Sequence, residues 1–277
     1  KKRSLLCAFL ILLSFSYAVT SQKIKPYNKT FFRNTGYGGF NSDDFFGDAS
    51  QFTIGENHTN PDIVVIGSSH AIMYYQMLKA IAQKNQLSVV FLTENGYAGR
   101  LRPNRSNEEN RLRDTTLLKK LSTLKPKIIF FGEKYDGQFN GNSQDFIQSY
   151  TYTFKHFLKH SSRIITVEQP PITGIVTNLE KYINKLQQSR KETIIRENPF
   201  YGKPRQMANK NLYELASTFN GKISVIPSED IFIQKSKIQI YDEHGIILYF
   251  DNHHLSMAGT YLLKDRVEKE ILTSLKK

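Results

Sequence analysis

The sequence contains a single cysteine, Cys7, so it offers neither an intrachain disulfide nor a cysteine-rich metal site. Acidic residues are also few: 25 Asp and Glu stand against 38 Lys and Arg, for a formal net charge of +13. The basic residues are spread along the chain, and no dense basic run follows Lys1, Lys2 and Arg3. Zinc-finger spacing, an aromatic RNA-binding motif and a basic helix are all missing from the sequence. We therefore expect no nucleic acid among its partners.

The remaining composition is typical of a folded protein. Hydrophobic residues make up 39% and charged residues 23%, and 19 Phe with 15 Tyr supply material for a core. A chain of 277 residues can hold one good-sized domain and a short extra segment.

An uncharged, mostly apolar stretch follows the three basic residues and covers residues 4–22. A helix of this length crosses roughly 30 Å of hydrocarbon, and the basic residues in front of it predict a cytoplasmic amino end with the rest of the chain outside. Two interpretations stay open for residues 1–22. They form either a retained transmembrane helix or a cleaved signal segment, for which Ser16 and Ala18 are small residues at the spacing of a cleavage site. On both interpretations the remainder is exported.

Two further segments are expected after this one. Residues 23–60 are rich in Gly, Asn, Asp and Phe without a sustained period, which predicts an irregular extension. Its aromatic residues indicate that it packs on the main domain. Residues 61–277 then form that domain, which we expect to carry the activity.

The main domain alternates short apolar runs with helical segments. The runs predicted as buried strands are residues 62–66, 87–92, 127–131, 163–167 and 222–226. The segments predicted as helices are residues 70–84, 115–124, 143–160, 207–219 and 256–275. Apolar strands separated by helices predict a central, mainly parallel sheet of about five strands between two layers of helices, a three-layer α/β/α sandwich.

Ser69 lies at the carboxyl end of the first predicted strand, where the chain turns into a helix. Active sites of open α/β sheets form at this edge, and a helix amino terminus adds backbone donors there. A serine hydroxyl becomes a nucleophile when a base takes its proton. The same position is also favoured by helix-capping serines, so the motif alone leaves both roles open.

The second pattern is Asp251-Asn252-His253-His254 near the carboxyl terminus. A carboxylate three residues before a histidine can accept from the imidazole Nδ1, which fixes the tautomer and stabilises the charged ring. The alternative is a metal site with Asp251, His253 and His254 as ligands. Because adjacent histidines seldom reach one metal and no fourth ligand is evident, we expect no metal.

Together the two patterns resemble the SGNH (GDSL-like) hydrolase superfamily, which has a flavodoxin-like fold. They are most similar to the SGNH domain fused to acyltransferase-3 membrane proteins, which O-acetylate bacterial surface glycans. The matching segments are Gly67-Ser68-Ser69-His70-Ala71 and Asp251-Asn252-His253-His254-Leu255-Ser256-Met257-Ala258-Gly259. The resemblance implies a triad of Ser69 as nucleophile, His254 as base and Asp251 as orienter.

The resemblance also implies an oxyanion hole, with two departures from the family pattern. The backbone N–H groups of Ser69 and Gly99 are the expected donors, with Gly96 as second choice. Ser68 stands where the family usually has Asp, and residues 132–135 lack the Asn of the family's third block, Gly-x-Asn-Asp. Which group supplies a third donor stays open.

The function implied is transfer of an acyl group, most simply acetyl, to a sugar hydroxyl of a bacterial surface glycan such as O-antigen. No cofactor is expected to bind directly, because the acetyl group would come from cytoplasmic acetyl-CoA through an acyltransferase-3 membrane domain in cis or in trans. The expected location is the bacterial inner membrane with the main domain in the periplasm, or outside the membrane if residues 1–22 are cleaved. Two alternatives stay open: an esterase or deacetylase of acylated glycans or lipids with the same triad, and a non-catalytic glycan-binding module.

Overall fold

The computed structural model describes residues 53–93, 99–102, 108–139, 141–173, 197, 199–243 and 246–276. Its main sheet has six strands in the order β1-β3-β2-β4-β5-β6. These strands are β1 (Thr53–Ile54), β2 (Ile63–Gly67), β3 (Val89–Thr93), β4 (Ile128–Gly132), β5 (Arg163–Val167) and β6 (Ile223–Ile226). All neighbouring pairs are parallel except β1 with β3. The predicted α/β class with a mainly parallel sheet is confirmed.

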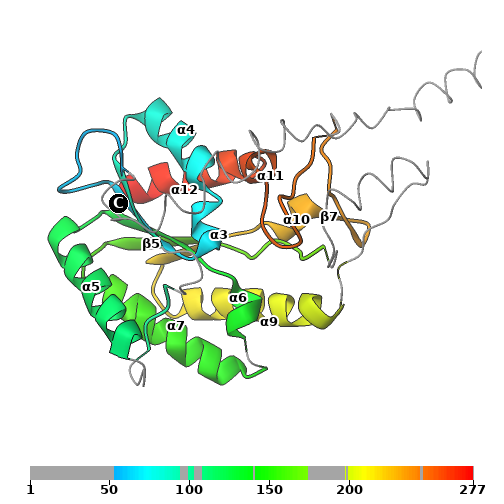
Figure 1. Ribbon diagram of the computed structural model, residues 1–277, viewed down its shortest axis with the longest axis horizontal. Helices are drawn as coiled ribbons and strands as arrows, with labels where there is room; N and C mark the ends of the chain where they lie inside the picture. The colour runs from blue at the N-terminus through cyan, green and yellow to red at the C-terminus, as the bar shows by residue number, and fades with distance from the viewer. Residues whose placement is uncertain are drawn as a thin grey trace, which may run out of the picture.

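Helices cover both faces of this sheet (Figure 1). Those of eight residues or more are α4 (Tyr75–Asn85), α5 (Glu108–Leu124), α7 (Ser143–Phe157), α9 (Pro199–Ser217) and α12 (Lys264–Leu275). The short ones are α3 (Ser69–Ile72), α6 (Tyr135–Gln138), α10 (Glu229–Phe232) and α11 (Met257–Tyr261), and β7 (Ile233–Gln234) pairs with β8 (Lys237–Ile238). Helices α4 and α12 lie on one face, and α5, α7 and α9 lie on the other (Figure 1).

The two faces hold separate hydrophobic cores, and the strands supply both. Within β2, Ile63 and Val65 join the core beneath α4 and α12, whereas Val64 and Ile66 join the core beneath α5, α7 and α9. Successive side chains of a strand point to opposite faces, so a strand buried on both faces needs apolar residues at every position. This requirement explains the unbroken apolar runs in the sequence.

Several predicted boundaries are wrong. The helix expected over 70–84 is two helices, α3 and α4, and that expected over 256–275 is likewise split into α11 and α12. Helix α5 begins at Glu108 rather than at 115, and α9 begins at Pro199 rather than at 207, although Pro204 lies inside it. The sixth strand, β1, belongs to the segment expected to be irregular; at two residues it is too short to show a period.

The expected membrane or signal helix over residues 1–22 lies outside the described residues, as does most of the 23–60 extension. Among the helices that are described, none is both long enough and apolar enough to span a bilayer. The described end of the extension packs on the main domain, since Ile54 is buried in the core beneath α4. The division at residues 22 and 60 stays a prediction.

Candidate active site

The nucleophile turn, Gly67–Ser69, connects β2 to α3 at the carboxyl edge of the sheet. Gly67 has a φ of +139°, and a Cβ atom there would lie 1.8 Å from the carbonyl oxygen of Gly132 on β4. Ser68 donates its N–H to that same oxygen (3.2 Å), and its hydroxyl caps α3 by accepting from the His70 N–H (3.4 Å). Ser68, not Ser69, therefore has the capping role that the sequence left open, and Ser69 is the first helical residue.

The acid–base loop, Asp251–His254, is held by the Asp251 carboxylate. Its Oδ1 accepts from the backbone N–H groups of His253 (2.9 Å) and His254 (2.7 Å), and its Oδ2 lies 2.6 Å from the His254 Nδ1. Burial acts to raise the pKa of Asp251, but the hydrogen bond and charge of His254 outweigh it, with help from His253, and lower this pKa to about 2. The carboxylate is thus ionised at neutral pH and fixes a proton on the imidazole Nδ1.

The loop and the turn meet across 185 residues of sequence, where the His254 Nε2 lies 2.9 Å from the Ser69 Oγ. With a proton on Nδ1, the Nε2 lone pair accepts from the Ser69 hydroxyl. The structure therefore brings together Ser69, His254 and Asp251 in the order needed for a base to take the proton of a nucleophile.

Two more histidines pack beside this set. The His70 Nε2 lies 3.2 Å from the His253 Nδ1, and their rings are nearly parallel, with 14° between planes. Burial, followed by the charges of neighbouring histidines and of Lys134, lowers the pKa of His70 well below its usual value. Burial and the charge of His254 likewise lower the pKa of His253 to about 4. Both rings are therefore neutral at neutral pH.

Of the described residues, His70, His253 and His254 form the one group placed to hold a metal ion, with ligand atoms within 4.8 Å of one another. This differs from the alternative set at the sequence level, because His70 takes the place of Asp251. Both ring nitrogens of His254 already face Asp251 and Ser69. A metal bound by all three histidines would displace one of these contacts.

The three expected oxyanion donors have different outcomes in the structure. Gly99 packs against the nucleophile turn, since a Cβ atom there would lie 3.0 Å from the Gly67 Cα. Its N–H, however, donates to the Glu133 Oε2 (2.9 Å), so it does not point at a reacting group in this conformation. Gly96 lies outside the described residues. The Ser69 N–H remains the expected donor at the start of α3.

Glu133 is the site residue that sequence reasoning missed. It follows the last residue of β4, it is only 3% exposed, and burial raises its pKa to about 7 in spite of hydrogen bonds from Ser68, Lys134 and Gly99. Its position in the family's third block was the available signal. The family pattern assigns a role to the Asn of that block and none to the position that Glu133 occupies.

A cavity of about 330 Å³ lies beside the turn and is lined by both Gly67 and Gly99. Its other walls are mainly apolar, from β2, β3 and α5, and the charged residues Glu109, Arg113 and Lys120 also line it. The cavity leaves room for a small substrate group at the carboxyl edge of the sheet, beside Gly67 and Gly99.

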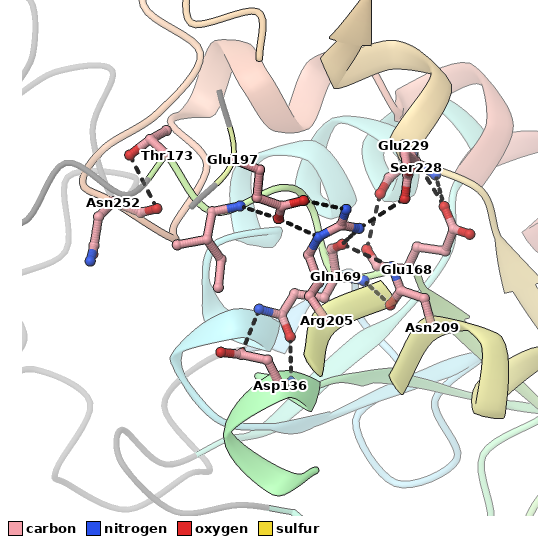
Figure 2. A network of polar contacts seen from close by, with 11 residues as sticks. Asp136, Glu168, Gln169, Thr173, Glu197, Arg205, Asn209, Ser228, Glu229 and Asn252 are labelled. Carbon is pink, nitrogen blue, oxygen red and sulfur yellow. Dashed lines mark hydrogen bonds and ion pairs between the residues drawn. The ribbon is translucent and has the colours of Figure 1, made fainter. Parts of the chain in front are cut away.

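A network of polar contacts reaches the acid–base loop at Asn252 (Figure 2). The Thr173 N–H donates to the Asn252 carbonyl oxygen (2.9 Å), and the neighbouring Ile172 N–H donates to the Glu197 carboxylate (3.0 Å). That carboxylate pairs with Arg205 of α9 (2.5 Å), whose side chain is fully buried and which also pairs with Glu229 (3.0 Å). The sequence gives no pattern for these contacts.

Comparison with known proteins identifies the family of the chain. A sequence model of the family described as "SGNH domain (fused to AT3 domains)" matches residues 38–269. No significant match exists among curated protein sequences.

Two solved structures share the fold. The periplasmic domain of the lipopolysaccharide acetyltransferase of Salmonella serovar Paratyphi A has a TM-score of 0.65 at 14% identity, covering 92% of this chain and 98% of that one. A putative acylhydrolase from Bacteroides fragilis has a TM-score of 0.50 at 12% identity, covering 82% of this chain and 93% of that one. At such identities the likeness concerns the fold alone.

Proposed function

The chain belongs to the family of SGNH domains fused to acyltransferase-3 domains, and on this premise we propose that it transfers an acyl group through Ser69. Membership makes it an acyl-related enzyme of the SGNH hydrolase and acyltransferase superfamily. The acceptor in our proposal is a sugar hydroxyl of a bacterial surface glycan, such as O-antigen or its lipid-linked precursor, and the acyl group is acetyl.

The observation that carries the proposal is the alignment of three side chains, with the His254 Nε2 2.9 Å from the Ser69 Oγ and the His254 Nδ1 2.6 Å from Asp251. In the first step the Ser69 Oγ bonds to the acyl carbon, and its proton passes to His254. The bond from the acyl carbon to the donor oxygen or sulfur then breaks, and the leaving group takes that proton.

In the second step the acceptor hydroxyl gives its proton to His254 and its oxygen bonds to the acyl carbon. The Ser69 Oγ leaves and recovers the proton. The ionised Asp251 stabilises the imidazolium that exists between these transfers. The negative oxygen of each tetrahedral intermediate needs backbone donors, of which the Ser69 N–H is the one we assign.

The donor and the location in our proposal are suggested by the family. Because acetyl-CoA is cytoplasmic, an acyltransferase-3 membrane domain in cis or in trans would deliver the acetyl group to this domain. We propose that the domain works in the periplasm at the inner membrane. The lipopolysaccharide acetyltransferase domain with the same fold supports both the acetyl group and this compartment.

A hydrolase is the second candidate, and the fold shared with a putative acylhydrolase favours it. Transfer and hydrolysis differ in whether a sugar hydroxyl or water attacks the acyl-enzyme. Incubating the purified chain with a generic acetyl ester, with and without an acceptor glycan, separates the two. We expect acetylated glycan to form, and to be lost in both Ser69→Ala and His254→Ala variants that remain folded. Acetate release at an unchanged rate with no glycan product would favour the hydrolase.

A further inference from the structure

A buried carboxyl group that the proposed mechanism does not use lies next to the nucleophile turn. Glu133 is the residue that follows β4, and its side chain is almost completely buried. Taking a carboxyl group out of water is costly unless hydrogen bonds compensate. A buried glutamate that has no ion-pair partner among the described residues therefore calls for a specific reason.

Each oxygen of this carboxyl group holds a different segment. Oε2 accepts from the Gly99 N–H (2.9 Å), Oε1 accepts from the Lys134 N–H (3.1 Å), and the side chain also hydrogen-bonds to Ser68. Glu133 therefore joins the loop after β3, the turn after β2 and the end of its own strand. These are the three strand ends that surround Ser69.

The hydroxyl of Ser68 connects this carboxyl group to α3. A hydroxyl donates one hydrogen bond and keeps lone pairs for others, so Ser68 can donate to Glu133 while it accepts from the His70 N–H. The Ser68 hydroxyl thus links the first turn of α3, which carries Ser69, to the residue that follows β4.

We propose that Glu133 is a positioning residue of the acyl-transfer site, which holds the Gly99 loop and the nucleophile turn together and thereby fixes the hydroxyl and the backbone N–H of Ser69. The inference rests on the proposed function of Ser69. Glu133 does not touch the reacting atoms; it acts through Ser68 and Gly99.

The structure also explains why residue 99 is a glycine. Its N–H is held by Glu133, and a side chain at this position would strike the Gly67 Cα and the Ile66 side chain, each 3.0 Å from a Cβ atom. Gly99 is therefore needed for close packing against the turn, and its N–H reaches an oxyanion only if Glu133 releases it.

The substitution Glu133→Gln tests this arrangement because it preserves size and removes one acceptor. An amide has one oxygen, so it satisfies either the Gly99 N–H or the Lys134 N–H, and its NH₂ group faces the other donor. We expect kcat for a generic acetyl ester to fall by about 100-fold, the effect of a small misplacement in a catalytic site, with KM changed by less than about threefold.

Glu168→Gln is the matched control. Glu168 is also a buried glutamate directly after a strand, and its Oε2 accepts from the backbone N–H groups of Ser228 (2.7 Å) and Glu229 (3.1 Å), away from Ser69. One amide oxygen can accept from both groups, and we expect kcat within about threefold of the unmodified chain.

The outcomes separate the inference from the function on which it rests. Active sites are first counted by reaction of Ser69 with a fluorophosphonate in each folded variant. If Glu133→Gln lowers only the number of folded molecules and each remaining site turns over at the original rate, Glu133 is merely structural and the inference is overturned. If the unmodified chain itself fails to react at Ser69, the proposed function fails first.

Discussion

On one side of Ser69, four consecutive residues form the acid–base loop and hydrogen-bond to one another. On the other side, three separate strand ends meet at the Glu133 carboxyl group. The contacts of Asp251 span two or three residues of sequence, but the Gly99 N–H and its acceptor are 34 residues apart. A short motif can specify the first arrangement by itself. The second exists only after the sheet has formed.

The two carboxyl groups also differ in how their surroundings shift their pKa values. Hydrogen bonds and charge from neighbouring histidines lower the pKa of Asp251 to about 2, whereas burial raises the pKa of Glu133 to about 7. The partners of Asp251 stabilise its ionised form, whereas burial of Glu133 disfavours its ionised form.

Asp251→Asn should have the largest effect, a fall in kcat of about 10,000-fold. An amide that faces the His254 Nδ1 through its NH₂ group favours the tautomer with the proton on Nε2, which leaves no lone pair for the Ser69 hydroxyl. Initial rates with an acetyl ester measure this fall in kcat. Asp230→Asn is the control, because Asp230 is exposed and pairs with Arg266, which is outside the motif. A loss below about tenfold would show that the loop does not depend on Asp251 in this way.

Arg205→Met should destabilise the fold by about 3–5 kcal/mol, because it leaves the buried Glu197 carboxylate without its partner. Urea unfolding measures this free energy. Arg266→Met, which removes an exposed ion pair, should cost no more than about 1 kcal/mol. If the acid–base loop is self-contained, the folded molecules of Arg205→Met keep kcat within about threefold. A collapse of kcat per folded molecule would mean that the network in Figure 2 determines the loop as well.

Glu133→Gln should change how stability depends on pH. The folded state raises the pKa of this acid from 4.5 to about 7, so it binds the proton more tightly than the unfolded state. Protonation of Glu133 therefore contributes most to the free energy of unfolding below pH 4.5. This contribution, up to about 3 kcal/mol, is lost as pH rises through about 7. The nearby Tyr135 and Tyr150 stay neutral over this range, because burial raises their pKa values.

The stability of Glu133→Gln relative to the unmodified chain should therefore increase between pH 4 and pH 8, as measured by urea unfolding at several pH values. Glu168→Gln provides the comparison for a generic loss of a buried carboxyl group. A difference between Glu133→Gln and the unmodified chain that stays constant across pH would contradict the raised pKa.

His253→Gln should have the smallest effect, a change in kcat below about tenfold. Its side chain faces His70 at 3.2 Å, and its backbone N–H contact with Asp251 survives the substitution. Acetyl-ester turnover measures it, with His254→Gln as the matched change at the adjacent position. Equal losses in the two variants would show that the site uses both histidines.

The sequence predicts the parts of this molecule that depend on local patterns. The strand expected over 163–167 is β5 with the same bounds, and the pattern from Asp251 to His254 forms the loop that a carboxylate three residues before a histidine allows. Helix boundaries were harder, since α9 begins eight residues early and keeps Pro204 within it. Packing of α9 on α7 and β6 outweighs the intrinsic preference of proline.

The oxyanion side of the site shows most clearly what the sequence could not predict. The family resemblance implies a glycine after the second predicted strand, and Gly99 does lie against Gly67. The direction of its N–H was not predictable, because the acceptor belongs to a buried residue of another strand end. Hydrogen-bond direction in a loop depends on contacts that only the assembled sheet provides.

The central claim is that His254 activates Ser69 for attack on an acyl group. A fluorophosphonate probe measures this activation directly, because it bonds to an activated serine and loses fluoride, and peptide mass mapping locates the product. We expect modification at Ser69 in the unmodified chain, and a rate lower by about 1,000-fold or more in His254→Ala. A folded chain that the probe leaves unmodified, or that it modifies equally fast without His254, would contradict the account.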